Sequence, residues 1–338
     1  MTIRQEEKIV VAGAGSIGCY VGGQLAGAGR NVRFLSRQRI ADELAQHGLT
    51  VTDLQGGTVS VSAGDLAIGT DPMVLADADV ILVTVKSGAT REMANTIRQF
   101  APAHAVIVSL QNGIDNATIL QDELPGRTVV AGMVAFNVVA LGAGRFHRGT
   151  DGEIVIDAKA AELAAALSTP RMAIATHADM RAVAWGKLLL NLNNALNALA
   201  GVPLREELAS RDWRRVAAAC IGEALAALDA AGIVPAKVGK LPPAWLPAVL
   251  RLPDALFRIV AAAQLRIDPK ARTSMLEDLD QRRTTEIDQL QGAIVALASK
   301  HGTAAPMNRA VLDRIKAAER MGSGSPRLAA TELLSGAG

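Results

Sequence analysis

The stretch KIVVAGAGSIGCYVGGQLAGAGRNVRFLSR, residues 8–37, decides the fold of the N-terminal half of the chain. A short apolar run leads into Gly13, Gly15 and Gly18, which have GxGxxG spacing, and a helix-like segment and a second apolar run from Val32 follow. Glycines at such a junction permit a tight turn and let the backbone approach a pyrophosphate at the helix N-terminus. The stretch therefore predicts a βαβ unit that binds a nucleotide, although a tight turn without a ligand would need similar glycines. The residues expected to meet the cofactor in this turn are Gly13, Gly15, Ser16, Ile17 and Gly18.

The end of the second strand indicates which dinucleotide is bound. An NAD site usually carries Asp or Glu about 20 residues after the glycines, where the carboxylate accepts a hydrogen bond from the ribose 2′-OH. This chain has Ser36 and Arg37 there, and a guanidinium pairs with the 2′-phosphate that a carboxylate would repel. The sequence thus favours NADP(H), with Arg37 as the phosphate contact. For Arg37 and its neighbour Arg39 the alternative is an ordinary exposed charge.

The composition limits the class of protein. A length of 338 residues exceeds the roughly 100 to 200 residues of a usual domain, so two domains are expected. Lys and Arg total 35 against 33 Asp and Glu, and the net charge of +2 gives no reason to expect a nucleic-acid or membrane partner. Cys19 and Cys220 lack metal-ligand spacing, which predicts reduced thiols. The charged start TIRQEEK and the longest apolar run, residues 129–144, fit neither a signal peptide nor a spanning helix, so a cytoplasmic protein is expected.

Hydrophobic periodicity divides the chain into an α/β domain over residues 1–178 and a helical domain over residues 179–338. In the first domain, apolar runs at residues 79–86 and 105–113 are each followed by a helix-like stretch. This alternation is typical of an open parallel sheet.

Local patterns refine both domains. Residues 48–64 predict a hairpin that turns at Gly56 and Gly57, and consecutive strand-like runs beyond Thr128 predict an antiparallel extension of the sheet. The last stretch, residues 322–338, is expected to be loose. In the second domain a 3.6-residue period predicts helices over residues 178–200, 205–231, 253–265, 274–301 and 307–320.

The segment WGKLLLNLNNALNAL, residues 185–199, places polar groups on an apolar helix. Lys187, Asn191 and Asn194 are separated by four and three residues, so they lie within about 40° of one line on a continuous helix. Asn193 and Asn197 lie on another face, where capping, solvent or interhelical hydrogen bonds explain them better. Residue statistics alone would make Lys187 an exposed lysine.

Four separated motifs carry a resemblance to a known family. GAGSIG and WGKLLLN together resemble the nucleotide turn and the lysine-bearing helix of the ketopantoate reductases (2-dehydropantoate 2-reductases), relatives of the 6-phosphogluconate-dehydrogenase-like hydroxyacid dehydrogenases. The stretch TSMLEDLDQRRTTEIDQLQGAIVALASKHGTAAPMN, residues 273–308, is similar to the second signature of that family, and VTVKS and SLQNG stand at strand ends. The likeness covers residues 8 to about 320.

The resemblance implies a Rossmann-type N-terminal domain, an all-α C-terminal domain, and reduction of 2-dehydropantoate to (R)-pantoate by NADPH, for pantothenate and coenzyme A. Carried across by motif, Lys187 is the catalytic lysine and Asn191 the substrate asparagine one turn later. One departure is that the second asparagine of the family helix falls on Ala195 here, with Asn194 just before it. The remaining residues that the resemblance assigns to cofactor or substrate are Lys86, Asn112, Ser274 and Glu286.

The reaction needs these residue types. Hydride transfer to a 2-oxo carbon leaves a developing alkoxide, which a cationic acid such as Lys187 both stabilises and protonates. Glu286 either keeps that lysine charged in a desolvated site or binds a substrate hydroxyl. Ser274 and Asn191 supply donors for the substrate carboxylate. For Glu286 the alternative is an exposed helix residue that pairs with Arg282 or its neighbour.

Two other interpretations stay open. A paralogue would keep the scaffold and reduce another 2-oxo acid, whereas a nucleotide sensor would keep the glycines and Arg37 without needing Lys187.

Histidines are scattered along the sequence and no metal cluster is expected. We expect the active site in the cleft between the domains. The segment over residues 236–270 looks like an insertion that covers this cleft, packs between subunits of a homodimer, or only adds to the core.

Overall fold

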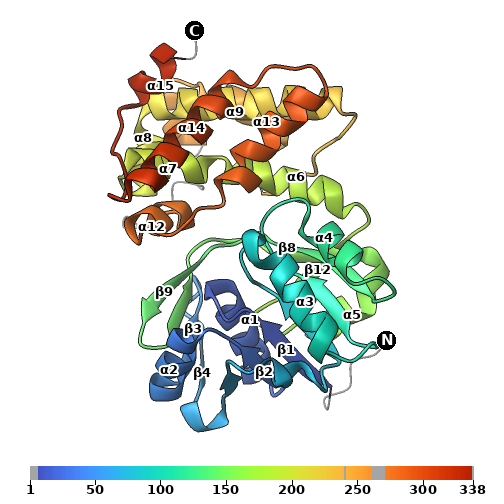
Figure 1. Cartoon of the computed structure of the whole chain (residues 1–338). Coiled ribbons are helices and arrows are strands. Elements are labelled where there is room, and N and C mark those ends of the chain that lie inside the picture. The colour runs from blue at the N-terminus through green and yellow to red at the C-terminus, as the bar shows by residue number, and fades with distance from the viewer. Residues whose placement is uncertain (1–6, 240, 261–270, 337–338) are drawn as a thin grey trace. The chain divides into compact units, whose positions relative to one another are not determined.

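A computed structural model describes residues 7–239, 241–260 and 271–336 (Figure 1). The chain divides into two compact units, Met1–Met180 and Arg181–Gly338. The first unit alternates strands and helices, and the second is helical (Figure 1). The predicted fold class, a Rossmann-type α/β domain followed by an all-α domain, is confirmed.

An eight-stranded sheet of order β12-β11-β8-β7-β6-β1-β2-β5 forms the centre of the first unit. Every residue of β6 and β7 is buried and all but Ser109 are apolar, as expected for strands of a sheet that helices cover on both faces. Ile9 and Val11 of β1 face the core on the α1 side, whereas Val10 and Ala12 face the core of α3 and α4. The strands are β1 (Lys8–Ala12), β2 (Asn31–Leu35), β5 (Ala67–Gly69), β6 (Val80–Val83), β7 (Val106–Ser109), β8 (Val129–Val134), β11 (Ile154–Asp157) and β12 (Ile174–His177). The helices are α1 (Ser16–Gly27), α2 (Gln38–His47), α3 (Thr90–Phe100), α4 (Asn116–Glu123) and α5 (Ala161–Leu167), with short turns η1 (Ala63–Asp65), η2 (Pro72–Leu75), η3 (Ser87–Ala89) and η4 (Ala158–Ala160).

The strands after residue 128 only partly follow the predicted antiparallel extension. The β11 strand pairs antiparallel with β8, as expected, but β8 is parallel to β7 because α4 forms a crossover between them. The strands β9 and β10 leave this sheet and join the hairpin in a second sheet of order β4-β3-β10-β9. The predicted hairpin is confirmed, with Gly56 at φ +79° in its turn. The strands of the second sheet are β3 (Leu49–Thr52), β4 (Thr58–Val61), β9 (Val138–Gly142) and β10 (Arg145–Arg148).

The second unit contains helices only, within the residues described after His177. Both cysteines are buried and free, as predicted. Within the insertion-like segment α10 packs against α9, while residues 240 and 261–270 lie outside the described residues. The elements are α6 (Met180–Asn191), α7 (Asn193–Ala200), α8 (Leu204–Ala209), α9 (Arg211–Ala230), η5 (Pro243–Trp245), α10 (Leu246–Leu250), α11 (Asp254–Val260), α12 (Ser274–Asp280), η6 (Ile287–Gln289), α13 (Gln291–Lys300), α14 (Pro306–Met321) and α15 (Ala330–Gly336).

Several predicted helices are interrupted. The helix over residues 178–200 breaks at Leu192, and the one over 205–231 breaks at Ser210, whose backbone is extended. The single helix over residues 274–301 is wrong, because Arg282 adopts φ +55° and ends α12. The stretch expected to be loose contains α15, and the last residues of the helix predicted over 253–265 lie outside the described residues.

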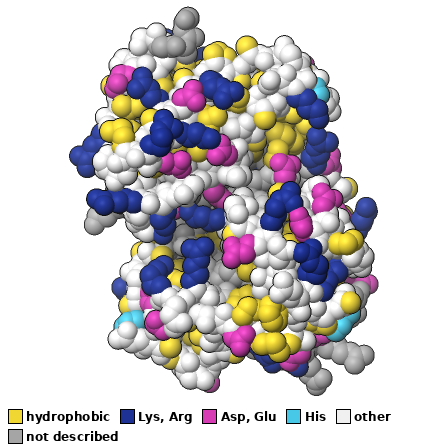
Figure 2. All heavy atoms as spheres, in the orientation of Figure 1, with side chains coloured by type: hydrophobic (Ala, Val, Ile, Leu, Met, Phe, Trp, Pro, Cys, Tyr) yellow, Lys and Arg dark blue, Asp and Glu magenta, His cyan; other side chains and the backbone are white. Residues whose placement is uncertain are grey.

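Charges of both signs are interspersed on the face of the molecule that Figure 2 shows. This mixture agrees with 35 basic and 33 acidic residues in the chain. Within the described residues, no helix combines the length and the apolarity that crossing a bilayer requires.

Candidate active site

The glycine-rich turn after β1 places its three glycines in three different environments. Gly13 has φ +109°, and a Cβ there would lie 2.8 Å from the backbone nitrogen of Val85. A Cβ on Gly18 would lie 2.4 Å from the Gly13 carbonyl oxygen and 2.6 Å from Thr84 Oγ1. By contrast, a Cβ on Gly15 would meet no protein atom within 4 Å. Packing within the protein therefore accounts for Gly13 and Gly18 but leaves an open space over Gly15.

The same turn lies where the strand order reverses. From β1 the chain first adds β2 on one side and later β6 on the other, so the carboxyl end of β1 is a topological switch point. Gly15 is the N-cap of α1, and the first turn of α1 carries no acidic residue and no side-chain cap. This leaves backbone N–H groups and the positive end of the helix dipole at the open space.

Arg37 follows β2 at the neighbouring strand end. The turn is tied to this strand, because the Gly13 N–H donates to the Leu35 carbonyl at 3.0 Å. Arg37 is exposed and, within the described part of the chain, forms no ion pair, whereas Arg39 pairs with Glu43 at 3.4 Å. Of the two arginines, Arg37 is therefore the one available to an added anion.

A buried polar network holds the loops that carry Lys86 and Asn112. The Ser87 hydroxyl donates to the Asn112 carbonyl at 2.8 Å, which links the loop after β6 to the loop after β7. Further links run through Gln111 and Asn116, which both hydrogen bond to Thr90. The network fixes the strand-end lysine and asparagine on adjacent parallel strands beside the glycine-rich turn.

Lys187 lies on α6 in the second unit and is partly buried. Burial lowers the pKa of its ammonium from 10.5 to about 8, although the Glu286 carboxylate acts in the opposite direction. Glu286 is partly buried and is the N-cap residue directly before the turn η6. The lysine and the glutamate are thus brought into electrostatic contact by two elements about 100 residues apart in sequence.

Glu286 does not lie on a helix with the neighbouring arginines. The Arg283 guanidinium binds Asp278 at 2.9 Å. The backbone N–H of Thr285 donates to the Glu319 carboxylate at 2.7 Å and not to a backbone carbonyl one turn earlier, as it would in an α-helix. Because the backbone here is not α-helical, Glu286 does not pair with these arginines at helical spacing.

Two of the four asparagines in the segment after Lys187 form structural hydrogen bonds, as their spacing predicted. Asn193 donates to buried Glu207 at 2.9 Å, and Asn197 donates to the Val202 carbonyl at 2.9 Å. The Asn197 side-chain oxygen also accepts from the backbone N–H and the hydroxyl of Thr273. These interhelical bonds confirm the structural interpretation of Asn193 and Asn197.

Ser274, Asn191 and Asn194 remain as the polar groups of the predicted substrate set in this unit. Ser274 is exposed at the first position of α12, directly after Thr273, whose hydroxyl donates to the Asn194 carbonyl at 3.2 Å. Asn191 and Asn194 are partly buried on either side of the break at Leu192.

Glu207 is a buried acid that no local pattern predicts. Its side chain is 0% exposed, one carboxyl oxygen accepts from Asn193, and Oε1 has no partner within the described residues. Burial raises the pKa of the Glu207 carboxyl from 4.5 to about 8, and the Asn193 bond offsets this only in part. Glu206 beside it is exposed, so the pattern LREELA does not distinguish them.

We expect the stability of the protein to fall as the pH rises towards 8 because of Glu207. Between pH 4.5 and about 8 the folded state keeps a proton that the unfolded chain releases, so the free energy of unfolding decreases with pH. From pH 6 to 8 the decrease from this one group is about 2 kcal/mol. Urea unfolding of the wild type and of Glu207→Gln at both pH values measures it. Glu207→Gln should lose this dependence and Glu206→Gln should keep it; equal slopes for all three proteins would refute the prediction.

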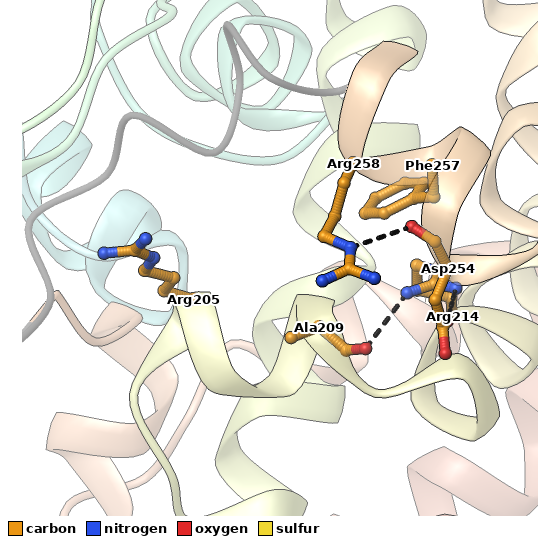
Figure 3. Close-up of a pocket in the computed structure, with 6 residues that line it drawn as sticks. All are labelled: Arg205, Ala209, Arg214, Asp254, Phe257 and Arg258. Carbon is orange, nitrogen blue, oxygen red and sulfur yellow. Dashed lines mark hydrogen bonds and ion pairs between the residues drawn. The ribbon is translucent and has the colours of Figure 1, made fainter.

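A cavity of about 300 Å³ lies elsewhere in the second unit (Figure 3). Arg214 is buried there, and its five N–H groups donate to carbonyl oxygens at the ends of α8 and α10 and to the Asp254 carboxylate. Figure 3 shows the Arg205 side chain directed away from Arg258. The arginines therefore do not converge on one point, and Arg214 serves as a shared helix cap. The cavity is lined by Arg205, Ala209, Arg214, Asp254, Phe257 and Arg258, none of which belongs to the predicted site.

A doubly covered parallel sheet with a glycine-rich turn at its switch point, joined to a helical unit with a lysine–glutamate pair, is the construction of a dinucleotide-dependent reductase. Residues 9–160 match the family model described as ketopantoate reductase PanE/ApbA, and residues 179–319 match that of its C-terminal part. The chain therefore belongs to the ketopantoate reductase family and is an oxidoreductase.

Individual relatives agree with this assignment. A 2-dehydropantoate 2-reductase of Halobacterium salinarum is 32% identical over 93% of this chain and 100% of its own length. The crystal structure of a PanE/ApbA family ketopantoate reductase from Ralstonia eutropha JMP134 superposes with a TM-score of 0.78 at 28% identity, covering 93% of this chain and 99% of that one. D-mandelate dehydrogenase, solved with NADH and anilino(oxo)acetate, has the same fold, with a TM-score of 0.77 at 22% identity over 93% of this chain and 99% of its own.

Proposed function

We propose that the protein reduces 2-dehydropantoate to (R)-pantoate with NADPH, a step towards pantothenate. The observation that supports this most is the Lys187–Glu286 pair, which occurs in a chain that matches the ketopantoate reductase models over both halves. A nucleotide sensor would have no use for a partly buried lysine held against a carboxylate, because burying that charge costs free energy.

In the proposed reaction Lys187 is the general acid. With a pKa of about 8, its amine is about nine-tenths protonated at pH 7, so it holds the proton that the alkoxide oxygen needs. Glu286 acts on this amine by favouring its charged form. The hydride itself is supplied by the reduced nicotinamide when the cofactor is bound. Its position near the lysine also supports a second role, in which Glu286 binds a substrate hydroxyl.

The remaining polar residues bind and orient. Ser274, Asn191 and Asn194 offer hydroxyl and amide donors to the substrate carboxylate without competing with Lys187 as acids. Asn112 and Lys86 serve the cofactor from the strand-end loops, and the Asn112 amide also serves the substrate. A preorganised set of this kind lowers the barrier mainly by orientation.

The glycine-rich turn fits a dinucleotide. The space over Gly15 is open and lies next to free helix N–H groups, as a pyrophosphate requires. The residues that would hold the cofactor there are Gly13, Gly15, Ser16, Ile17 and Gly18, with Arg37 at the 2′-phosphate.

Arg37→Ala should raise the KM for NADPH by about 10- to 100-fold, because one charged hydrogen-bond partner contributes roughly 1.5–3 kcal/mol. The KM for NADH should stay within about twofold, since NADH lacks the 2′-phosphate. Steady-state kinetics with both cofactors measure this, and Arg39→Ala, whose guanidinium is already paired with Glu43, is the matched control. Equal losses with NADPH and NADH would show that Arg37 does not read the phosphate.

A second candidate is a paralogous reductase of another 2-oxo acid. The observation that favours it is Ala195, which is fully buried and apolar at the position where the family helix is expected to carry its second asparagine. A panel of 2-oxo acids that includes 2-dehydropantoate, followed by NADPH oxidation, separates the two. Highest kcat/KM with 2-dehydropantoate supports the first proposal; turnover of a different acid alone supports the second. NADPH binding without any turnover would support a sensor.

A further inference from the structure

Gln291 is a buried amide inserted at the break of the lysine helix. It is the first residue of α13, its side chain is 0% exposed, and its Nε2 donates to the Leu192 carbonyl oxygen at 2.8 Å. Leu192 is the residue between α6 and α7; it keeps helical angles, φ −54° and ψ −29°, but belongs to neither helix. A side-chain donor inserted at a helix carbonyl is a recognised cause of such an interruption.

The bond joins the two elements that carry the lysine–glutamate pair. Lys187 lies on α6, which ends one residue before Leu192. Glu286 directly precedes η6, which ends two residues before Gln291. The hydrogen bond from Gln291 Nε2 to the Leu192 carbonyl oxygen links these two segments of the chain. This hydrogen bond therefore helps to set the distance between the turn that follows Glu286 and the helix that carries Lys187.

The amide is costly to keep for packing alone. Its other polar atom, Oε1, is buried and has no hydrogen-bond partner within the described residues. Leaving a buried acceptor unpaired costs roughly 1–3 kcal/mol, whereas an apolar side chain of similar size would avoid that cost. Because the unpaired Gln291 Oε1 lowers stability, stability alone does not explain why a glutamine occupies this position.

We propose that Gln291 is a positioning residue, which sets the distance between Lys187 and Glu286 by holding the Leu192 carbonyl at the helix break. This inference rests on the proposed function, in which Lys187 is the acid. Without the amide the two elements lose this hydrogen bond, so the carboxylate supports the ammonium less well. Gln291 acts on the pair through the Leu192 carbonyl and not by contact with the reacting atoms.

The test is Gln291→Met, which keeps the volume and removes the donor. In the apo protein with carbon-13-methylated lysines, NMR titration should show the pKa of Lys187 shifted down by about half a unit or more, because burial continues to lower it and Glu286 opposes this less. Lys187→Arg assigns the resonance. In the kinetic arm kcat should fall by about 10- to 100-fold, since small misplacements of a catalytic group have effects of this size. The KM for NADPH should change by less than about twofold.

The control is Gln281→Met, the same substitution at an exposed glutamine after α12, which should change neither quantity. If Gln291→Met does not fold, Gln291→Asn retains an amide that is too short to reach Leu192 and replaces it. An unchanged Lys187 pKa together with an unchanged kcat would overturn the inference. If the wild type reduces no 2-oxo acid, the proposed function fails, but the NMR titration still decides whether Gln291 controls the pair.

Discussion

Lys187→Ala lowers kcat with 2-dehydropantoate by about two to four orders of magnitude, the usual contribution of a general acid. The substitution removes both the proton and the positive charge that meet the developing alkoxide, so the loss is in the transition state rather than in substrate binding. The KM for NADPH should change little, because the glycine-rich turn belongs to the other unit of the chain. Steady-state kinetics at pH 7 measure both constants.

Two companions sharpen this result. Lys300→Ala removes an exposed lysine at the end of α13 and should leave kcat within about twofold of the wild type. Lys187→Arg keeps the charge but holds its proton too firmly to transfer it, so it should stay far below the wild type. If Lys187→Ala retains more than about a tenth of the wild-type kcat, the lysine is not the acid.

Gly15→Val weakens dinucleotide binding by at least about 100-fold while leaving the fold intact. The new side chain meets no protein atom at its Cβ and the backbone there, φ −82°, suits any residue, so the folded protein tolerates it. The isopropyl group occupies the open space over the helix N-terminus and blocks the charged hydrogen bonds to phosphate, which contribute roughly 1.5–3 kcal/mol each. Fluorescence titration of NADPH measures the Kd, and thermal unfolding checks the fold.

The matched control is Gly222→Val, at another glycine with open space around its Cβ, in the middle of α9. It should leave the Kd for NADPH unchanged. Gly18→Ala should differ from both, because its methyl would press into the Gly13 carbonyl at 2.4 Å and lower the melting temperature. Undiminished NADPH binding by Gly15→Val would place the dinucleotide elsewhere.

The features that local sequence could predict are those whose causes lie within one turn or one βαβ unit. The GxGxxG spacing and the buried runs of β6 and β7 are contiguous, so their interpretation needed no distant residue. The separation of Asn193 and Asn197 from the lysine stripe followed from helical geometry and was right for the same reason.

The features that could not be predicted depend on partners far away in the chain. Residues 145–147 pair with residues 50–52 in the second sheet, and no local pattern selects that pairing over the first sheet. The lysine helix breaks where Gln291, 99 residues later, inserts an amide at Leu192, while the 3.6-residue period of the sequence continues through the break. Gln291 stands two residues after Gln289, and the sequence pattern does not distinguish the buried Gln291 from the partly buried Gln289.

The most direct test of the account compares two pKa values for Lys187. One is measured by carbon-13 NMR of the methylated lysines in the free protein, and the other is the basic limb of kcat/KM against pH, which reports the essential acid of the free enzyme. Because the acid must be protonated, activity should fall as the pH rises through that limb. We predict that both values lie near 8 and coincide. A Lys187 that titrates near its ordinary 10.5, or a basic limb that does not follow it, would contradict the assignment of Lys187 as the proton donor.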